Sequence, residues 1–583
     1  MALTNREIAD IFETVADMLQ IRGDVIHRVL SYRRASETIR ELPRDLRAIS
    51  AEGGLSDLPG IGKTLADKID EMLETGELEF YSRLAAEIPP GLVRVMHVNG
   101  VGPKKARLFW DEMNIASLEA LEEAAEASLL RPLKGMGAKS EQRILEGIAA
   151  LARKTGRTPL GVALPAAQEL LDSLLSLPQA GCGYVAGSIR RGRPSIGDVD
   201  LLVASDEAAP LMDAFVSMPQ VARVLGHGPT KSSVELHSGL QVDLRVLSAA
   251  RMGTALSYFT GSQAHNVRLR ERALRLGYSL NEHALRPVGA DGSSLDEEAN
   301  HVLCASEEEL YERLGLPFIA PELREDAGEF EAADAGELPE LITLQDLRAD
   351  LHMHSTWSDG REDIRAMVGG ARARGRKTVV ITDHSQYSAI ANGLDADRLL
   401  RQQLEVRAVD REFPDMRVLH GVEMDIRADG TLDYPNDLLS QLDFVVASLH
   451  YSLRQERSVI TRRLLNAIEN PHVDLIGHPH GQLIEKRPPA DLDMDAVFEA
   501  AARTGTALEI NSNPQRLDLE AHYARRAVEL GIPLSINSDA HDTAGMDLLP
   551  YGILTARRGW VQAENVINAW PQDRLLAWLE RKA

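Results

Sequence analysis

Two aspartates separated by a single residue form the first group of side chains in this sequence that could do chemistry. They are Asp198 and Asp200, in the run G-D-V-D at 197–200. Residues two apart in a β-strand face the same side, so both carboxylates project together. Like charges at this spacing repel unless cations lie between them, and two divalent ions about 4 Å apart use such carboxylates in phosphoryl transfer. A third acid is expected on a neighbouring strand, and Asp243 in Q-V-D-L-R-V fits.

A run that contains glycine and arginine lies just upstream of the two aspartates. In G-S-I-R-R-G (187–192), Gly187 and Ser188 allow a ligand to approach the backbone closely, and Arg191 offers a planar guanidinium for phosphate oxygens. A bare D-x-D is more typical of a polar strand edge. Together with this upstream run and the downstream aspartate, the pattern predicts nucleotidyl transfer.

Histidines and acids at the ends of strand-like runs form a second group, in the carboxyl-terminal half. The carboxyl ends of strands in an α/β barrel meet on one face, so these clusters are expected to converge. Neutral imidazoles and carboxylates suit Zn²⁺, Mn²⁺ or Fe²⁺, and adjacent ions lower the pKa of a water between them. A lone H-x-H is more often structural, but six clusters favour a metal site. They are D-L-H-M-H (350–354) followed by Asp359, T-D-H (382–384), G-V-E (421–423), S-L-H (448–450), G-H-P-H (477–480) and N-S-D-A-H (537–541).

A short glycine repeat occurs three times in the amino-terminal part, at 58–66, 98–106 and 133–140. In each copy the glycines allow a tight turn, and the helix that follows begins with unpaired N–H groups that suit a phosphate. One copy alone would indicate an ordinary corner between helices. Three copies with trailing lysines predict DNA binding without sequence preference, through Gly60, Gly62, Lys63, Gly100, Gly102, Lys104, Lys105, Gly135, Gly137 and Lys139.

The elements that must position these residues follow from the apolar spacing. Residues 1–155 have the helical period, whereas 183–247 contain short β-branched runs bounded by Gly, Pro and Ser. Residues 325–340 are acidic and rich in small residues, which predicts a linker. Beyond it, strand-like runs alternate with amphipathic helical patterns, and this alternation predicts a parallel, barrel-like α/β domain.

Length and composition set limits on the class of protein. The 583 residues are enough for about four domains, and 44% hydrophobic with 26% charged residues is typical of folded, soluble chains. No apolar run reaches the ~20 residues of a membrane span, and no export signal is found. Two distant cysteines, Cys182 and Cys304, exclude a disulfide scaffold and a thiolate zinc finger and fit the cytoplasm. The net charge of −24 does not exclude a nucleic-acid partner, because local basic surface decides binding.

The motifs of the first half resemble the family X DNA polymerases, of the DNA polymerase beta type, over residues 1–320. The resemblance is carried by G-S-I-R-R-G-x4-G-D-V-D (187–200), V-D-L-R (242–245) and Y-F-T-G-S (258–262). It implies that Asp198, Asp200 and Asp243 bind two Mg²⁺ or Mn²⁺ ions, with Asp243 helping to activate the primer 3′-hydroxyl.

The same resemblance implies a nucleotide site around these carboxylates. One set would hold the triphosphate, a second would exclude a ribose 2′-hydroxyl, and a third would face the minor groove of the nascent pair and template. These sets are Ser188, Arg191 and Gly197; Tyr258, Phe259 and Gly261; and Asn266 and Arg270. Departures from the animal enzymes at Ala163, Gln241 and Gln263 predict weaker nucleotide binding or an altered metal preference.

Two further features of the amino-terminal part follow from resemblance. The glycine repeats resemble helix-hairpin-helix motifs, which implies a monovalent cation on hairpin carbonyls, with those of Met96, Val98 and Val101 as candidates. Residues 27–35 resemble a 5′-phosphate pocket that includes His27 and Tyr32, and Lys68 matches the Schiff-base nucleophile of a deoxyribose-phosphate lyase. The alternative is that Lys68 is an ordinary solvated lysine on an acidic helix. In the pocket, Arg28 stands where the family has a lysine.

The second half resembles the polymerase-and-histidinol-phosphatase (PHP) domain, over about residues 346–570. The resemblance implies nine metal ligands on up to three Zn²⁺, Mn²⁺ or Fe ions. His352, His354, Glu423 and Asp539 would hold one ion; Glu423, His450 and His478 the second; Asp359, His384 and His541 the third. Asp383 and His480 are expected behind these ligands. An intact site favours hydrolysis at a DNA 3′ end, by exonuclease action, removal of blocking groups or cleavage at an abasic site.

We therefore predict a multidomain enzyme: all-α helix-hairpin-helix domains, an α+β nucleotidyltransferase palm with a thumb, and a distorted (β/α)7 barrel. The expected domains are 1–85 (5′-phosphate binding, lyase-like), 86–157 (fingers-like), 158–250 (palm), 251–324 (thumb), 325–345 (acidic linker) and 346–583 (PHP). We expect a cytoplasmic monomer with no membrane partner that binds gapped or nicked DNA and dNTPs, fills short gaps and processes 3′ ends. The alternatives are a DNA-end scaffold with weak polymerase activity, or a barrel that acts as a small-molecule phosphatase.

Overall fold

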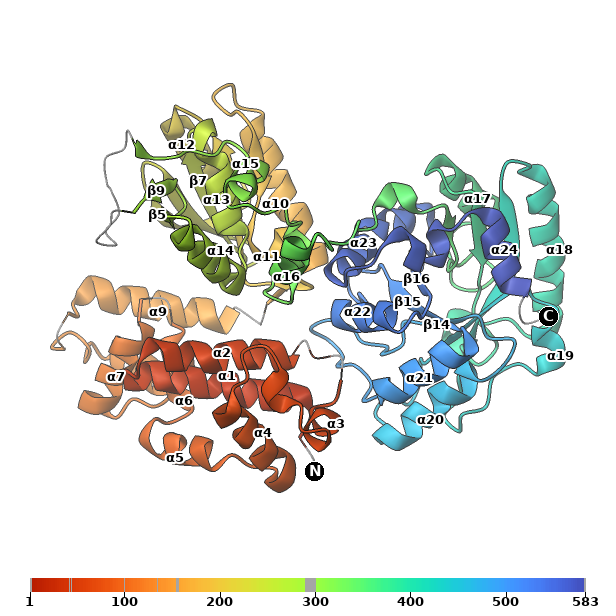
Figure 1. The fold of residues 1–583 in the computed structure, drawn as a ribbon, viewed down its shortest axis with the longest axis horizontal. Coiled ribbons are helices and arrows are strands. Elements are labelled where there is room, and N and C mark those ends of the chain that lie inside the picture. Colours follow the sequence, from red (N-terminus) through yellow and green to blue (C-terminus); the bar gives the residue numbers. More distant parts are fainter. Residues whose placement is uncertain are drawn as a thin grey trace. The chain divides into compact units, whose positions relative to one another are not determined.

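The protein folds into two compact units, Met1–Gly156 and Arg157–Ala583. The computed structural model describes residues 3–40, 42, 44–98, 100–133, 135–153, 157–288 and 300–580 (Figure 1). None of the helices described there is long and apolar enough to cross a membrane.

The first unit is built from helices around one apolar core. Helix α1 (Asn5–Arg22) begins at Thr4, which forms a reciprocal capping pair with Glu7, and it ends at Gly23 in the left-handed conformation. The core is continuous from Ile8 to Ile148, so the predicted boundary after residue 85 falls within it. The other helices are α2 (Ile26–Arg40), α3 (Leu46–Ala51), α4 (Lys63–Thr75), α5 (Glu79–Glu87), α6 (Gly91–Met96), α7 (Gly102–Met113), α8 (Leu118–Glu126) and α9 (Ala138–Arg153).

The second unit begins with a five-stranded palm sheet in the order β2-β4-β7-β6-β5. Side chains along β4 alternate between the two faces of the sheet. Val199, Leu201 and Val203 pack into the palm core, whereas Asp198 and Asp200 face the other side. The palm elements are β1 (Thr158–Pro159), α10 (Leu160–Leu175), β2 (Gly183–Val185), α11 (Gly187–Arg190), β3 (Ser195–Ile196), β4 (Asp198–Ala204), α12 (Ala208–Val216), β5 (Val221–His227), β6 (Lys231–Leu236) and β7 (Gln241–Leu247).

The thumb follows, with α13 (Met252–Thr260), α14 (Gln263–Arg275), β8 (Tyr278–Leu280), β9 (Leu285–Pro287) and α15 (Glu307–Arg313). Residues 325–340, which the composition predicts to be a linker, are folded. They contain α16 (Glu329–Ala335) and buried acids. Glu329 is fully buried and its carboxylate lies 2.8 Å from Nδ1 of His265 in the thumb. Glu325 and Glu329 are partners of basic groups, and composition alone does not reveal partners that are distant in sequence.

The remaining chain forms a parallel seven-stranded sheet surrounded by helices (Figure 1). The ends of the first and last strands meet, since the His352 carbonyl accepts from the Asp539 N–H and the Ala540 carbonyl from the His354 N–H. The predicted multidomain class with a distorted (β/α)7 barrel is confirmed. The elements are β10 (Ala349–Asp350), α17 (Ile364–Ala373), β11 (Thr378–Ile381), α18 (Ala396–Glu412), β12 (Arg417–Asp425), α19 (Asn436–Leu439), β13 (Phe444–Ser448), α20 (Arg457–Ile468), β14 (Leu475–Gly477), α21 (Met494–Thr504), β15 (Ala507–Asn511), α22 (Ala521–Glu529), β16 (Leu534–Asn537), α23 (Leu549–Arg558) and α24 (Gln572–Glu580).

Candidate active sites

The three palm aspartates lie together on neighbouring strands. Strands β4 and β7 run parallel with Asp200 directly opposite Asp243, and Asp198 precedes Asp200 on the same face. Burial raises the pKa of Asp200 to about 6, and the nearby Asp198 and Asp243 carboxylates add to the effect. Mutual repulsion of this kind is relieved by a divalent cation, so the donor set fits the predicted two-metal site.

The glycine before Ser188 permits a close backbone approach to this cluster. Gly187 has φ of +68°, and a Cβ at this position would lie 3.0 Å from Oδ2 of Asp200. Ser188 follows in the short helix α11, and Gly197 directly precedes Asp198. The sequence motif thus corresponds to a tight fit of the 187–191 turn against the carboxylates.

Lys231 on β6 is a member of the palm site that the sequence does not reveal. Its Nζ lies 2.8 Å from Oδ2 of Asp243, and Gln241 donates to the other oxygen at 3.1 Å. Burial opposes ionisation of Asp243, but bonds from Lys231, Ser233 and Gln241 outweigh it and lower the pKa of this carboxyl. Lys231 comes from a strand without a motif, and only the pairing of β6 with β7 brings it to the site.

The predicted nucleotide-selecting residues of the thumb also lie together. The Asn266 amide donates to the carbonyl of Tyr258 at 2.7 Å, and Nε of Arg270 donates to the carbonyl of Asn266 at 3.2 Å. The ring of Phe259 lies edge-on to that of Tyr258 and against the guanidinium of Arg245, 4.1 Å from its centroid. Gly261, at φ of +70°, ends α13. These contacts hold α13 and α14 against the palm strand that carries Asp243.

In the barrel, Glu423 lies at the centre of the nine predicted ligands. Its Oε1 is 3.2 Å from Nε2 of His450 and 3.0 Å from Nε2 of His478. Its Oε2 is 3.5 Å from Nε2 of His352 and 3.6 Å from Nε2 of His354. Oε2 also lies 3.0 Å from Nδ1 of His384, so Oε1 faces two imidazoles and Oε2 faces three. A carboxylate surrounded in this way can be shared between two ions.

The remaining ligands complete these groups at the rim of the barrel. Oδ1 of Asp539 lies 3.1 Å from Nε2 of His354, in the first group. Oδ2 of Asp359 lies 3.6 Å from Nε2 of His384 and 3.4 Å from Nε2 of His541, in the third. Asp359 is exposed and His541 is partly exposed, so this third group is open to substrate.

Unpaired buried atoms at the centre of this site fit divalent metal. Among the residues described, Nε2 of His352 and Nδ1 of His354 are buried without a hydrogen-bond partner. Burial lowers the pKa of His354 to about 3, with His541 and His384 adding to it, so its imidazole is neutral, the form that binds metal. Asp539 also has the uncommon left-handed φ of +53°, a strained backbone of the kind found at functional sites.

Two carboxylates that orient ligands were missed in the sequence. Glu509 on β15 lies 2.8 Å from Nδ1 of His352 and accepts from the N–H of His478, and Asp425 lies 2.9 Å from Nδ1 of His450. Each contact leaves the opposite ring nitrogen directed at the site. The signal for Glu509 is an acid within the apolar strand A-L-E-I-N, where a solvated carboxylate does not fit.

Asp383 and His480, expected behind the ligands, have different surroundings. Asp383 accepts bonds from the backbone N–H groups of Ser355 and Ser358 and so holds the turn between His354 and Asp359. His480 belongs to a separate buried group, with Nδ1 3.0 Å from Glu520 and 3.4 Å from Asp518.

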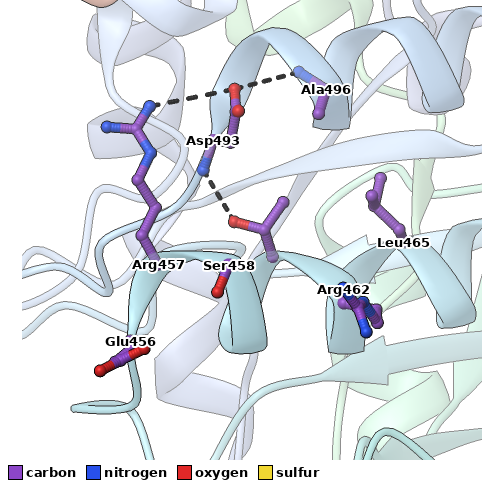
Figure 2. Close-up of a pocket in the computed structure, with 8 residues that line it drawn as sticks. Glu456, Arg457, Ser458, Arg462, Leu465, Asp493 and Ala496 are labelled. Atoms are coloured by element: carbon purple, nitrogen blue, oxygen red, sulfur yellow. Dashed lines mark hydrogen bonds and ion pairs between the residues drawn. The ribbon is translucent and has the colours of Figure 1, made fainter.

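A hollow on the outside of the barrel, between α20 and α21, contains none of the predicted ligands. Figure 2 shows its lining, in which Asp493 receives the N–H of Ala496 and lies 3.9 Å from Arg457. Asp493 also caps the first turn of α21. The bond from the Ala496 N–H to Asp493 is therefore explained by helix capping.

In the first unit, Lys68 lies in a basic, aromatic pocket. Its Nζ is 4.5 Å from the centroid of the Phe80 ring, which also contacts Arg28 at 5.1 Å and Arg83 at 5.6 Å. Burial lowers the pKa of Lys68, and Arg28 and Arg83 add to this while Glu71 opposes it. The predicted Tyr32 stacks on Phe80, and His27 is exposed one position before Arg28. Phe80 and Arg83 belong to α5, which has no motif to reveal them.

The three glycine repeats share one turn hydrogen bond but differ at the second glycine, which has a positive φ only in the second repeat, at Gly102. In each, an N–H bonds to the carbonyl three residues earlier, Ile61 to Leu58, Val101 to Val98 and Met136 to Leu133. Gly60, Gly100, Gly102 and Gly135 have positive φ, and Gly62 and Gly137 precede the starts of α4 and α9. Lys63, Lys104 and Lys139 are exposed at these helix starts, whereas Lys105 donates to the Gly100 carbonyl at 2.7 Å.

Sequence families match the chain segment by segment. A helix-hairpin-helix domain matches residues 3–78, a SAM-like helix-hairpin-helix tandem 93–150, the DNA polymerase beta thumb 255–325 and the PHP domain 350–513. The matches follow the same order as the predicted domains, although they leave the exact boundaries as predictions.

Individual relatives extend this comparison. DNA polymerase lambda of Rattus norvegicus is 26% identical over 343 residues, which is 55% of this chain and 56% of that protein. A Shewanella sp. (strain MR-4) protein named "Probable phosphatase" is 30% identical over 239 residues, 39% of this chain and 86% of its own. DNA polymerase/3′-5′ exonuclease PolX of Bacillus subtilis (strain 168) is 38% identical over 578 residues, 99% of each chain. Because this last similarity runs from end to end, the chain belongs to the PolX family, the family X DNA polymerases that carry a carboxyl-terminal PHP domain.

Proposed function

We propose that this protein is a DNA-directed DNA polymerase that fills short gaps in DNA repair and processes DNA 3′ ends in its PHP barrel. The observation that carries the polymerase half is the position of Asp200 opposite Asp243, with Asp198 beside them and Gly187 against Asp200. The barrel half is supported by Glu423, whose two oxygens lie among five imidazoles, two facing Oε1 and three facing Oε2.

In the palm, Asp198, Asp200 and Asp243 would hold two Mg²⁺ or Mn²⁺ ions, which neutralise the phosphate charge and favour attack by the primer 3′-hydroxyl. Asp243 accepts the hydroxyl proton or orients the hydroxyl. Ser188, Arg191 and Gly197 bind the triphosphate. Tyr258, Phe259 and Gly261 select against ribose, and Asn266 and Arg270 contact the minor groove.

In the barrel, the nine ligands hold up to three Zn²⁺, Mn²⁺ or Fe ions in the groups described above. Such ions lower the pKa of a water and polarise a phosphoryl oxygen. Glu509 and Asp425 keep His352 and His450 in the ligand tautomer. The substrate is the terminal phosphodiester of a DNA 3′ end, which reaches the site at its open rim beside Asp359 and His541.

The helical unit binds the DNA itself. The hairpin N–H groups and the exposed lysines contact phosphates, and a monovalent cation on the carbonyls of Met96, Val98 and Val101 assists them. The Lys68 pocket binds a 5′-phosphate with His27 and Tyr32, and the lowered pKa of Lys68 suits Schiff-base chemistry. We expect the enzyme to act as a monomer in the cytoplasm.

Primer extension distinguishes this proposal from a DNA-end scaffold. On a gapped duplex with dNTPs, the wild type extends the primer, while Asp198→Ala binds the same duplex without extending it. Extension by both proteins at the same rate would contradict the assigned palm site. Binding without extension by either would favour the scaffold.

The similarity to a protein named "Probable phosphatase" makes a small phosphomonoester the second candidate substrate of the barrel. Turnover of a histidinol-type phosphate and of a DNA 3′ end is compared at equal enzyme and metal concentrations. Faster hydrolysis of the DNA end supports the nuclease. Hydrolysis of the phosphomonoester alone would support the phosphatase.

A further inference from the structure

A buried carboxylate in the segment after the thumb joins the palm to the barrel. Glu325 is 7% exposed, and its Oε1 accepts from Nε of Arg191 at 3.0 Å and from Nη1 of Arg558 at 2.8 Å. Arg193 lies 3.7 Å from the same oxygen. Arg558 ends α23 of the barrel, so the barrel shares an anion with the arginine proposed to bind the triphosphate.

Arg558 also holds the backbone of that arginine. Its Nη1 donates to the carbonyl of Arg191 at 3.0 Å, so one guanidinium nitrogen contacts both Arg191 and Glu325. Helix α23 approaches closely because Gly192 has no side chain, since a Cβ there would lie 3.2 Å from Leu554 and 3.4 Å from Cδ of Arg558. Gly192, the second glycine of the G-S-x-x-R-G run, therefore allows the palm to contact α23 of the barrel.

Two side-chain nitrogens of Arg191 already have partners. Its Nε is engaged by Glu325, and its Nη1 donates to the main-chain carbonyl of Thr260 in the thumb. A planar guanidinium that is held at two nitrogens rotates less than one held at a single nitrogen. Nη2 of Arg191 therefore keeps a fixed direction. Because the side chain is already restrained, it loses less conformational entropy when a ligand binds.

Glu325 is surrounded by basic side chains. Three guanidinium groups share its carboxylate, and Arg558 both pairs with Glu325 and donates to the Arg191 carbonyl. Burial disfavours ionisation of Glu325, but Arg191, Arg558 and Arg193 outweigh it and lower its pKa to about 2. The carboxylate is ionised at every pH at which the enzyme would work.

We propose that Arg558 of the PHP domain, acting through Glu325 and the Arg191 carbonyl, positions Arg191 for the nucleoside triphosphate and so sets the affinity of the polymerase for nucleotides. The inference rests on the proposed function of Arg191 in the palm. Arg558 and Glu325 are positioning residues, because neither needs to touch the nucleotide.

The chain provides a matched control one residue away. Arg557, on the same helix, donates to Glu322 at 2.7 Å and to the Ile342 carbonyl at 3.1 Å, so it also ties α23 to the segment after the thumb. These described contacts do not include the 187–193 turn. Loss of Arg557 loosens the same packing without removing a contact of Arg191.

The experiment measures KM for a dNTP and kcat for filling a one-nucleotide gap, with full-length Arg558→Met, Arg557→Met and Arg191→Met. We expect Arg558→Met and Arg191→Met each to raise KM for the dNTP about tenfold, as for one lost hydrogen bond between charged groups. Arg557→Met should keep the wild-type KM. Arg558→Lys, which keeps the charge but cannot make both contacts equally well, should give a smaller rise and guards against misfolding of the methionine variant.

The outcomes separate the inference from the proposed function. A raised KM in Arg191→Met with a wild-type KM in both Arg558 variants would overturn the inference and leave the palm site standing. Equal rises in Arg558→Met and Arg557→Met would also overturn it, because loosened packing would then account for the effect. A wild-type KM in Arg191→Met would remove the triphosphate role on which the inference depends.

Discussion

Lys231 and Asp243 form an ion pair across neighbouring palm strands, with Nζ 2.8 Å from Oδ2. A divalent ion bound by Asp243 must share this carboxylate with the ammonium group. Lys231 is 45% exposed, and pairs of this kind contribute about 0.2–1 kcal/mol.

Replacement of Lys231 by Met is therefore expected to strengthen metal binding in the palm. The concentration of Mg²⁺ that gives half-maximal primer extension should fall by roughly two- to fivefold. The measurement is a Mg²⁺ titration at saturating dNTP, with Lys377→Met, at an exposed lysine of the barrel, as the control. A higher Mg²⁺ requirement in Lys231→Met would show that this lysine assists the site.

In the absence of divalent ions, ionised Asp200 lowers the free energy of unfolding of the protein. Its pKa of about 6 lies above the ordinary value of 3.8, so the folded state holds a proton that the unfolded state releases between these values. Stability contributed by this group is present below pH 4 and is lost as pH rises through 6. We expect Asp200→Asn in EDTA to be more stable than the wild type by about 1–3 kcal/mol at pH 8. Thermal unfolding at pH 4 and pH 8 tests this, and an equal gain at both would contradict it.

The register of the palm shows what the sequence can predict. A two-residue period fixes Asp198 and Asp200 on one face, and a strand-like run around Asp243 supplies the third carboxylate, so the cluster was predicted from local pattern. The barrel ligands were predicted for the same reason, since each ends a strand and strand ends meet. Lys231, Glu509 and Phe80 were not, because their roles depend on which elements become neighbours.

The segment after the thumb shows the opposite case. Its acids and small residues predict a linker, yet Glu325 and Glu329 are buried against Arg191, Arg558 and His265. Each of these partners is more than 60 residues away in sequence, and a local window cannot reveal them. From composition alone, an acidic residue is expected to be exposed to solvent, because its partner in the fold is not known.

Glu509 is expected to be necessary for the barrel site although it is not a predicted ligand. Glu509→Gln weakens the hold on Nδ1 of His352 and should lower metal affinity or DNA 3′-end hydrolysis by roughly 10- to 100-fold. Metal content after dialysis and the hydrolysis rate are the measurements. Glu520→Gln, which alters the separate pair with His480, is the matched control and should have little effect. Equal losses in both variants would indicate general loosening of the barrel.

Lys68 is expected to form a covalent adduct with an abasic 5′ end. Its lowered pKa leaves more free amine at neutral pH, and reduction by borohydride traps the Schiff base. We expect a protein–DNA adduct with the wild type and with Lys377→Ala, at an exposed lysine of the barrel, and a loss of at least tenfold with Lys68→Ala. An adduct of equal yield without Lys68 would end the lyase proposal.

In this proposal, one chain carries two independent metal centres that act on DNA phosphodiesters. A gapped duplex labelled at the primer 5′ end reports extension and shortening in one gel, with Mn²⁺ or Mg²⁺ and with or without dNTPs. We predict that Asp198→Ala shortens the primer but does not extend it, and that His352→Ala extends the primer but does not shorten it. Loss of both activities in either well-folded variant would contradict the account.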